Sequence, residues 1–230
     1  MADTDLLWNQ RADPPKPARL ALTVDRIAEA ALALADAEGI ESVSMQQAAA
    51  RLDVTKMALY RHVANKAQLL GVMTELAIGP APDLAGVRGG WRGRLVEWCR
   101  LMRETWQRHP WLPTATVGDR PTGPREVAWT ESAVAALEGT GLTGGERMDA
   151  VFLLSGHLRN THSQASGGTQ PWLADRSLRP LVAGHPELFP ALVKAASEVD
   201  PGVDGDEFDH GWQFGLDRIL DGLAAVIKKR

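Results

Sequence analysis

Helix-start residues recur at short intervals between positions 23 and 65, and this spacing limits the fold more than any other feature of the sequence. Ser, Thr, Asp and Asn favour the position before a helix because their side chains accept hydrogen bonds from its first backbone N–H groups. Such residues precede apolar periodic segments at Thr23, Ser44, Thr55 and Asn65, and Ser44 opens a Ser-x-x-Gln capping box. The spacing predicts a series of short helices.

The two middle segments predict a helix, a tight turn and a second helix over residues 44–63. Leu59 and Val63, four residues apart, form the inward edge of the second helix. Asp53 occupies the turn, and Asp tolerates a left-handed backbone better than most residues other than Gly and Asn. This order is that of a helix-turn-helix, whose second helix lies in the DNA major groove with its N-terminal residues at the base edges.

The rest of the chain favours longer helices and no sheet, because no segment alternates polar and apolar residues in steps of two. We expect an all-α fold with a flexible N-terminal arm over 1–20, a helix-turn-helix domain with a connecting helix over 21–78, and a larger helical ligand-binding and dimerisation domain over 79–230. The expected helices of the larger domain span about 91–108, 112–117, 124–139, 143–164, 186–198 and 206–228.

Charge and cysteine content narrow the class of protein. The net charge of −4 argues against a protein that binds nucleic acid unspecifically through an overall positive surface. Residues 51–66 are nevertheless locally basic, because they contain Arg51, Lys56, Arg61 and Lys66 and a single acidic residue, Asp53. A solvated helix face is the alternative reading of that stretch. The single cysteine, the absence of an apolar leader and the absence of a membrane-length apolar run predict a cytoplasmic protein. No motif indicates an enzyme, a metal site or a cofactor.

The second helix of the motif carries side chains suited to DNA. Lys56 has donors for guanine acceptors, and Met57 and Ala58 are flexible or small enough to contact a thymine methyl group. Tyr60 and His62 have polar tips at the level of the phosphates, with Lys66 just beyond. Thr55, which opens the helix, belongs to the same candidate site.

The sequence resembles the TetR family of repressors. The resemblance rests on Val54-Thr-Lys-Met-Ala-Leu-Tyr-Arg-His-Val63, then Asn65-Lys66 and Leu69-Leu70, preceded by Ala35, Glu38, Gly39 and Val43, and it covers about positions 20 to 78. Asp53 departs from the glycine usual in the family's turn. The resemblance implies that the positions of Gln46, Lys56, Ala58 and Tyr60 contact bases or sugars, and that Tyr60, His62 and Lys66 hold phosphates. It also implies a homodimer on a pseudo-palindromic operator in double-stranded DNA.

Two helices are candidates for the dimer surface. In the last helix, over about 206–228, apolar side chains recur at steps of three and four: Phe208, Trp212, Leu216, Ile219, Leu223 and Val226. The helix over about 143–164, with Met148, Phe152, Ser155 and Leu158, would complete a four-helix interface with its two-fold copy. The alternative is that both apolar stripes serve only the core of one chain.

Tryptophans concentrated in the larger domain predict a pocket for a small, flat, largely apolar molecule. The candidate ligand-binding residues are Trp98, Met102, Trp106, Trp129, Phe152, His157 and Trp172. An aromatic stripe at helical spacing is more often core, and a structural role for His157 is the favoured alternative.

These patterns together predict a regulator released from its operator by a small-molecule effector. A DNA-binding regulator that needs no ligand, or that activates transcription, is one alternative. An enzyme with an incidental helix-turn-helix is another.

Overall fold

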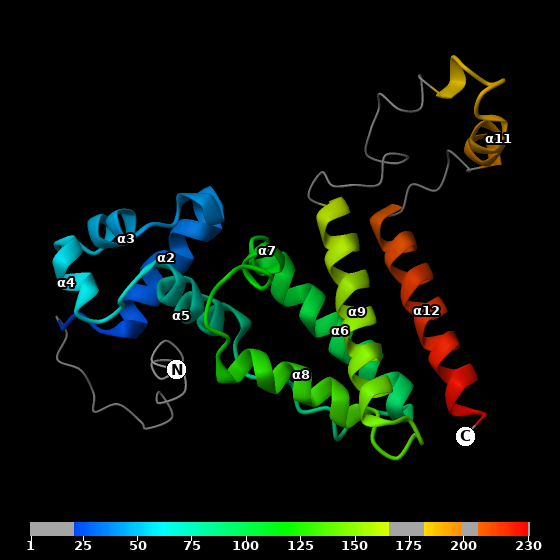
Figure 1. The fold of residues 1–230 in the computed structure, drawn as a ribbon, viewed down its shortest axis with the longest axis horizontal. Helices are drawn as coiled ribbons and strands as arrows, with labels where there is room; N and C mark the ends of the chain where they lie inside the picture. Colours follow the sequence, from blue (N-terminus) through cyan, green and yellow to red (C-terminus); the bar gives the residue numbers. More distant parts are fainter. Residues whose placement is uncertain (1–20, 166–181, 199–206, 230) are drawn as a thin grey trace. The chain divides into compact units, whose positions relative to one another are not determined.

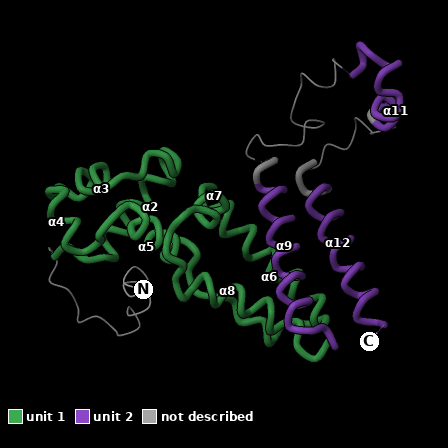
Figure 2. Tube along the Cα trace, in the orientation of Figure 1, with its two compact units in different colours: residues 1–140 green, residues 141–230 purple. Residues whose placement is uncertain are grey.

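A computed structural model describes residues 21–165, 182–198 and 207–229. Every regular element in these ranges is helical, which confirms the predicted all-α class. The chain divides into two compact units, residues 1–140 and 141–230 (Figure 2). The functional boundary expected after residue 78 stays a prediction, and the expected N-terminal arm lies outside the described residues. None of the described helices combines the length and hydropathy of a membrane span.

The first unit begins with a group of helices that we call the head, from α2 to α5 (Figure 1). Each of these helices starts where a capping residue was predicted, because the cap side chain accepts a hydrogen bond from a backbone N–H three residues on. The acceptor–donor distances are 3.2 Å at Thr23, 3.1 Å at Ser44, 3.2 Å at Thr55 and 2.8 Å at Asn65. The helices are α2 (Val24–Glu38), α3 (Met45–Arg51), α4 (Lys56–Tyr60) and α5 (Lys66–Ile78), with a 3-10 turn, η2 (Ile40–Ser42), after α2.

The core of the head consists of the apolar edges predicted from periodicity. Ile27 and Ala31 of α2 are fully buried, as are Leu59 and Val63 around α4 and Leu69 of α5. Burying one such leucine or isoleucine side chain contributes about 1.5–3 kcal/mol relative to leaving it in water. This shared core fixes the short helix α4, which could not form alone in water.

The first unit continues with α6 (Gly90–Arg108), α7 (Leu112–Ala115) and α8 (Pro124–Ala136). Trp98 of α6 and Trp129 of α8 meet edge to face at 6.3 Å between ring centroids, and the Trp98 indole Nε1 donates to the Trp129 carbonyl at 2.9 Å. Asp36 of α2 ties the head to the segment after α6, because its carboxylate accepts from the Trp111 indole at 2.7 Å and contacts His109 Nδ1 at 2.9 Å.

Cys99 lies buried on α6, and burial raises the pKa of its thiol well above the usual range. A thiol held in its neutral form is a poor nucleophile, so Cys99 acts as a small apolar side chain of the core.

The second unit contains α9 (Gly144–Ala165), α11 (Pro190–Glu198) and α12 (Glu207–Ile227). Thr143 and Glu146 cap α9 reciprocally, because each backbone N–H donates to the other's side chain, at 2.8 and 3.3 Å. Leu154 and Leu158 of α9 are buried, as are Leu216 and Leu220 of α12, and α9 and α12 pack against each other.

A close approach between α9 and α12 occurs where His157 stacks on Trp212, with 5.5 Å between the rings. His157 Nε2 lies 2.8 Å from the Trp212 carbonyl oxygen. Gly215 makes room for this ring, since a Cβ there would lie 2.2 Å from the imidazole.

Replacing Gly215 by alanine should therefore destabilise the protein although alanine favours helices. We expect Gly215→Ala to lower the free energy of unfolding by about 1–3 kcal/mol through overpacking. Gly211→Ala is the matched control, because nothing lies within 4 Å of a Cβ at that position of the same helix. Urea denaturation should show a loss for the first variant and none for the second; equal stability would contradict the close packing of His157.

Candidate nucleic-acid interface and ligand cavities

The turn between α3 and α4 is formed around a left-handed residue. Asp53 has φ 54°, and no other described residue except glycine has a positive φ. The Val54 N–H donates to the Ala49 carbonyl at 3.1 Å, which closes the turn against the end of α3. Asp is among the residues that reach this conformation at modest cost, so the predicted turn forms without glycine.

Six of the eight predicted DNA-binding side chains are exposed, and they lie on α3, around α4 and at the start of α5. Met57 is 71% exposed and Tyr60 39% exposed, whereas Leu59 between them is fully buried. Lys56 extends its Nζ over the Tyr60 ring at 5.6 Å from the centroid. Gln46, Thr55, Lys56 and Lys66 are exposed, and Ala58 and His62 are half-buried.

The helix itself is shorter than expected. Residues 56–63 were predicted as one helix, but α4 ends at Tyr60 and the chain continues in turns, with the His62 and Val63 N–H groups both donating to the Leu59 carbonyl. Val63 is buried and Asn65 must adopt an extended backbone to cap α5, so the helix ends before them. The exposed residues Lys56, Met57 and Tyr60 lie within α4 and keep their helical geometry, and Thr55 precedes them as the N-cap.

One cavity, which we call the Trp129 cavity, has a volume of about 510 Å³. The end of α5, the following segment and α6 line it together with Trp129 of α8. Its wall carries polar groups at Glu104, Thr105, Arg108 and His109 beside apolar surface from Leu76, Ala77, Ile78, Pro80 and Leu101. Arg108 donates to the Thr105 hydroxyl at 3.1 Å.

The predicted ligand-binding residues have different positions relative to this cavity. Trp129 lines it, and Trp98 is buried against Trp129. Met102 is half-buried and Trp106 is buried, both on α6. Phe152 is 66% exposed on α9, His157 packs on Trp212, and Trp172 lies outside the described residues. Their contact with a ligand stays a prediction.

Sequence reasoning missed the lining positions Leu101, Thr105 and Arg108. They recur at steps of four and three along α6, next to the tryptophan stripe rather than within it. Their spacing was the available signal. The stripe of large aromatic side chains predicted a pocket on the neighbouring face of α6, which is largely buried.

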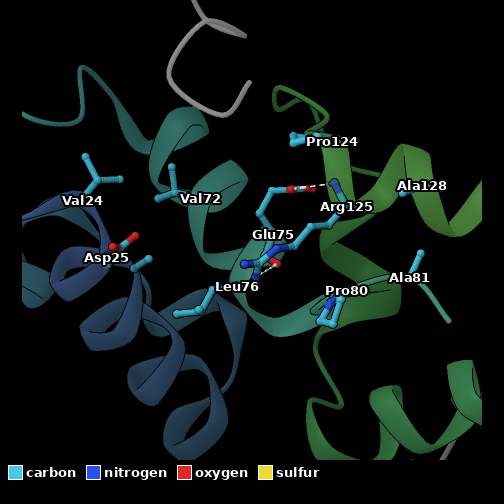
Figure 3. Close-up of a pocket in the computed structure, with 11 residues that line it drawn as sticks. Val24, Asp25, Val72, Glu75, Leu76, Pro80, Ala81, Pro124, Arg125 and Ala128 are labelled. Carbon is cyan, nitrogen blue, oxygen red and sulfur yellow. Dashed lines mark hydrogen bonds between the residues drawn. The ribbon is translucent and has the colours of Figure 1, made fainter. Parts of the chain in front are cut away.

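A second cavity, the Glu75 cavity, has a volume of about 300 Å³ between α2, α5 and the start of α8 (Figure 3). Glu75 of α5 is 7% exposed, and its carboxylate accepts from the backbone N–H groups of Arg125 at 2.8 Å and Glu126 at 3.1 Å. Burial raises the pKa of Glu75, against the lowering effect of these two hydrogen bonds. The Arg125 guanidinium donates in turn to the Glu75 carbonyl at 3.1 Å.

Comparison with known proteins identifies this arrangement. The family model of the N-terminal domain of bacterial regulatory proteins, tetR family, matches residues 21–73, and the tetracyclin repressor-like C-terminal domain matches residues 82–227. The chain belongs to the TetR family. Its members are DNA-binding transcriptional regulators with an N-terminal helix-turn-helix, so the TetR-family resemblance of the sequence is confirmed.

Several relatives of this TetR-family chain cover nearly its whole length. The HTH-type transcriptional repressor DrrR1 of Streptomyces coeruleorubidus is 32% identical over 240 residues, covering 98% of this chain and 86% of the relative. The tetracycline repressor protein class A from transposon 1721 of Escherichia coli is 25% identical, covering 88% of this chain and 91% of the relative.

Solved structures of the TetR-family protein ActR of Streptomyces coelicolor are similar in fold. The complex of ActR with (S)-DNPA has a TM-score of 0.74 at 26% identity and covers 90% of this chain and 99% of ActR. The complex with actinorhodin has a TM-score of 0.72 at 26% identity and covers 89% of this chain and 96% of ActR.

The exposed row of α4 in this TetR-family chain leads to a mutational prediction. Lys56→Ala or Tyr60→Ala should weaken binding to a specific site by about 1–3 kcal/mol, because each would remove one of the expected base or phosphate contacts. The measurement is a gel-shift titration on DNA selected by the wild-type protein from random fragments. Lys194→Ala, which removes an exposed lysine of α11, is the charge-matched control. Wild-type affinity in both α4 variants would contradict the placement of the DNA-reading helix.

Proposed function

We propose that this TetR-family regulator is a repressor that binds a pseudo-palindromic operator as a homodimer and is released by a small, largely apolar effector. The observation that carries the proposal is the exposed row Thr55, Lys56, Met57 and Tyr60 above a buried Leu59, in the same compact unit as a cavity lined by Trp129. A DNA-reading surface and an effector site are thus available within residues 1–140.

The DNA contacts follow from the chemistry of the exposed row. Lys56 donates to guanine, and Met57 and Ala58 contact thymine methyl groups. Tyr60, His62 and Lys66 contact the phosphates of the DNA backbone. Gln46 of α3 and Thr55 reach the same groove edge. One head reads only a few base pairs, so two heads about 34–36 Å apart are needed for operator affinity.

The Trp129 cavity supports the class of effector. An indole wall with Leu101 and Ile78 favours a flat aromatic molecule, while Arg108 supplies donors for oxygen atoms at its edge. The structures of ActR with (S)-DNPA and actinorhodin make actinorhodin a reasonable first probe for this chain.

Exposed apolar side chains on two helices of the second unit support the homodimer. Met148, Phe152 and Leu153 of α9 are exposed, as are Phe214 and Val226 of α12. Trp212 and Leu216, which belong to the predicted α12 stripe, are buried, so only part of that stripe remains for a partner. The side chain of Phe208 lies outside the described residues.

The decisive experiment is selection of operator DNA followed by release. DNA fragments that the protein selects from a random pool, and the DNA upstream of its own gene, are titrated with the protein by gel shift at physiological salt concentration. A footprint with two-fold symmetry would support a dimer. Increased transcription from the promoters that contain the footprint, on deletion of the gene for this protein, would support a repressor. Decreased transcription would instead identify an activator, and absence of any selected sequence would refute the proposal.

Filling the Trp129 cavity should separate effector response from DNA binding. We expect Leu101→Trp to reduce release of operator by actinorhodin at least about tenfold, because the larger ring occupies the cavity. Leu101→Met, which nearly conserves volume, is the matched control. Both variants should bind operator like wild type in the absence of the probe. Full release of the Trp variant would place the effector elsewhere.

Charges on the exposed face of α9 should disrupt the dimer. Phe152→Asp should shift the protein from dimer to monomer in analytical ultracentrifugation and weaken operator binding, since an unpaired charge buried in an interface is costly. Val117→Asp, at a 67% exposed position of the first unit, is the control and should remain dimeric. A dimeric Phe152 variant would remove α9 from the interface.

A further inference from the structure

We infer that Glu75 is a positioning residue that couples the head to the wall of the Trp129 cavity, by serving as the N-terminal cap of α8. This inference rests on the proposed function, because it assigns the residue through which the effector site and the DNA-reading surface influence each other. The contact lies entirely within the first unit.

Helix α8 has no cap of its own. Gly123 occupies the N-cap position without a side chain, and Pro124 follows it as the first helical residue. The next backbone N–H groups, of Arg125 and Glu126, donate instead to the two carboxylate oxygens of Glu75, about 50 positions earlier in the chain. A carboxylate here satisfies the free donors and interacts favourably with the helix dipole.

Glu75 and a local cap exclude each other. A Cβ at residue 123 would lie 2.2 Å from Cδ and 2.4 Å from Cγ of Glu75. Gly123 has an extended backbone, φ −101° and ψ 175°, that an aspartate or serine N-cap also adopts. The glycine is therefore required by the position of the Glu75 side chain and not by backbone strain.

Further hydrogen bonds join the last turn of α5 to α8. The Arg125 guanidinium donates to the Glu75 carbonyl at 3.1 Å, and the Trp129 indole donates to the Gly79 carbonyl at 3.3 Å (Figure 3 shows the first of these). Trp129 also lines the Trp129 cavity. A ligand that displaces Trp129 therefore acts on the same helix that Glu75 caps.

Hydrogen bonds from Arg120 hold the segment before α8 in place, so the start of the helix that Glu75 caps has a defined position. The Arg120 side chain is 2% exposed and donates to the carbonyls of Ala115 and Pro121 and to the Glu126 carboxylate, at 2.7, 3.1 and 2.7 Å. Movement of α8 is thereby transmitted to the end of α5 and through it to the other helices of the head, α2 to α4.

A pair of variants separates capping from coupling. Glu75→Ala removes both roles. Glu75→Ala combined with Gly123→Asp restores a local cap, because the atoms nearest a Cβ at residue 123 are those of Glu75 and have been removed. Glu75→Gln keeps the size of the side chain and one acceptor oxygen, and Glu29→Ala, which removes an exposed carboxylate of α2, is the control.

We expect Glu75→Ala to lower Tm by about 3–6 °C, as for loss of a helix cap, and the double variant to recover most of that loss. Operator affinity on the selected DNA should fall about tenfold in both, since a loosened head must be ordered on binding. In hydrogen exchange, the start of α8 should be protected again in the double variant while the end of α5 is not. The Tm and the operator affinity of Glu75→Gln should lie between those of the wild type and those of Glu75→Ala.

The outcomes distinguish the inference from the proposed function. A double variant with wild-type operator affinity overturns the coupling role, and an unchanged Tm in Glu75→Ala overturns the capping role. If Glu75→Ala does not fold, the double and Gln variants give the same comparison. Failure of the wild-type protein to select any DNA would refute the proposed function and leave the cap measurable by Tm and hydrogen exchange.

Discussion

The buried carboxylate of Glu75 is the contact on which the arrangement of the first unit depends. Removing a charged group from water is costly unless hydrogen bonds replace hydration, and here two backbone N–H groups of α8 do so. The raised pKa of Glu75 shows that burial outweighs these bonds in its effect on ionisation. A carboxylate buried at such a cost fits a positional role, because the same side chain closes the start of α8 and fixes the end of α5.

Local features of the fold could be predicted from the sequence because their interactions span only a few residues. Thr23, Ser44, Thr55 and Asn65 each accept a backbone hydrogen bond three positions on, so each cap was visible in the sequence. The turn at Asp53 is likewise local, and its left-handed backbone was expected. The exposed row of α4 followed from knowing that Leu59 and Val63 face inward.

Contacts between distant residues could not be predicted in this way. The pairing of Glu75 with α8 joins positions about 50 apart, and nothing near either position indicates the other. The tryptophans show a related limit, since periodicity gives the face of α6 but not what covers it. Trp98 is buried against Trp129, whereas the cavity uses the adjacent face with Thr105 and Arg108. The structural contact of His157 likewise depends on a distant residue, because its ring lies beside the Trp212 carbonyl.

The steric exclusion between Glu75 and any side chain at residue 123 has a consequence for sequence divergence. Two solutions close the start of α8, a long-range carboxylate opposite glycine or a capping side chain opposite a small residue, and a mixture of the two either collides or leaves donors unsatisfied. Single substitutions between the solutions pass through a less stable protein. The two positions are therefore expected to change together across related chains, as a correlated pair 48 residues apart.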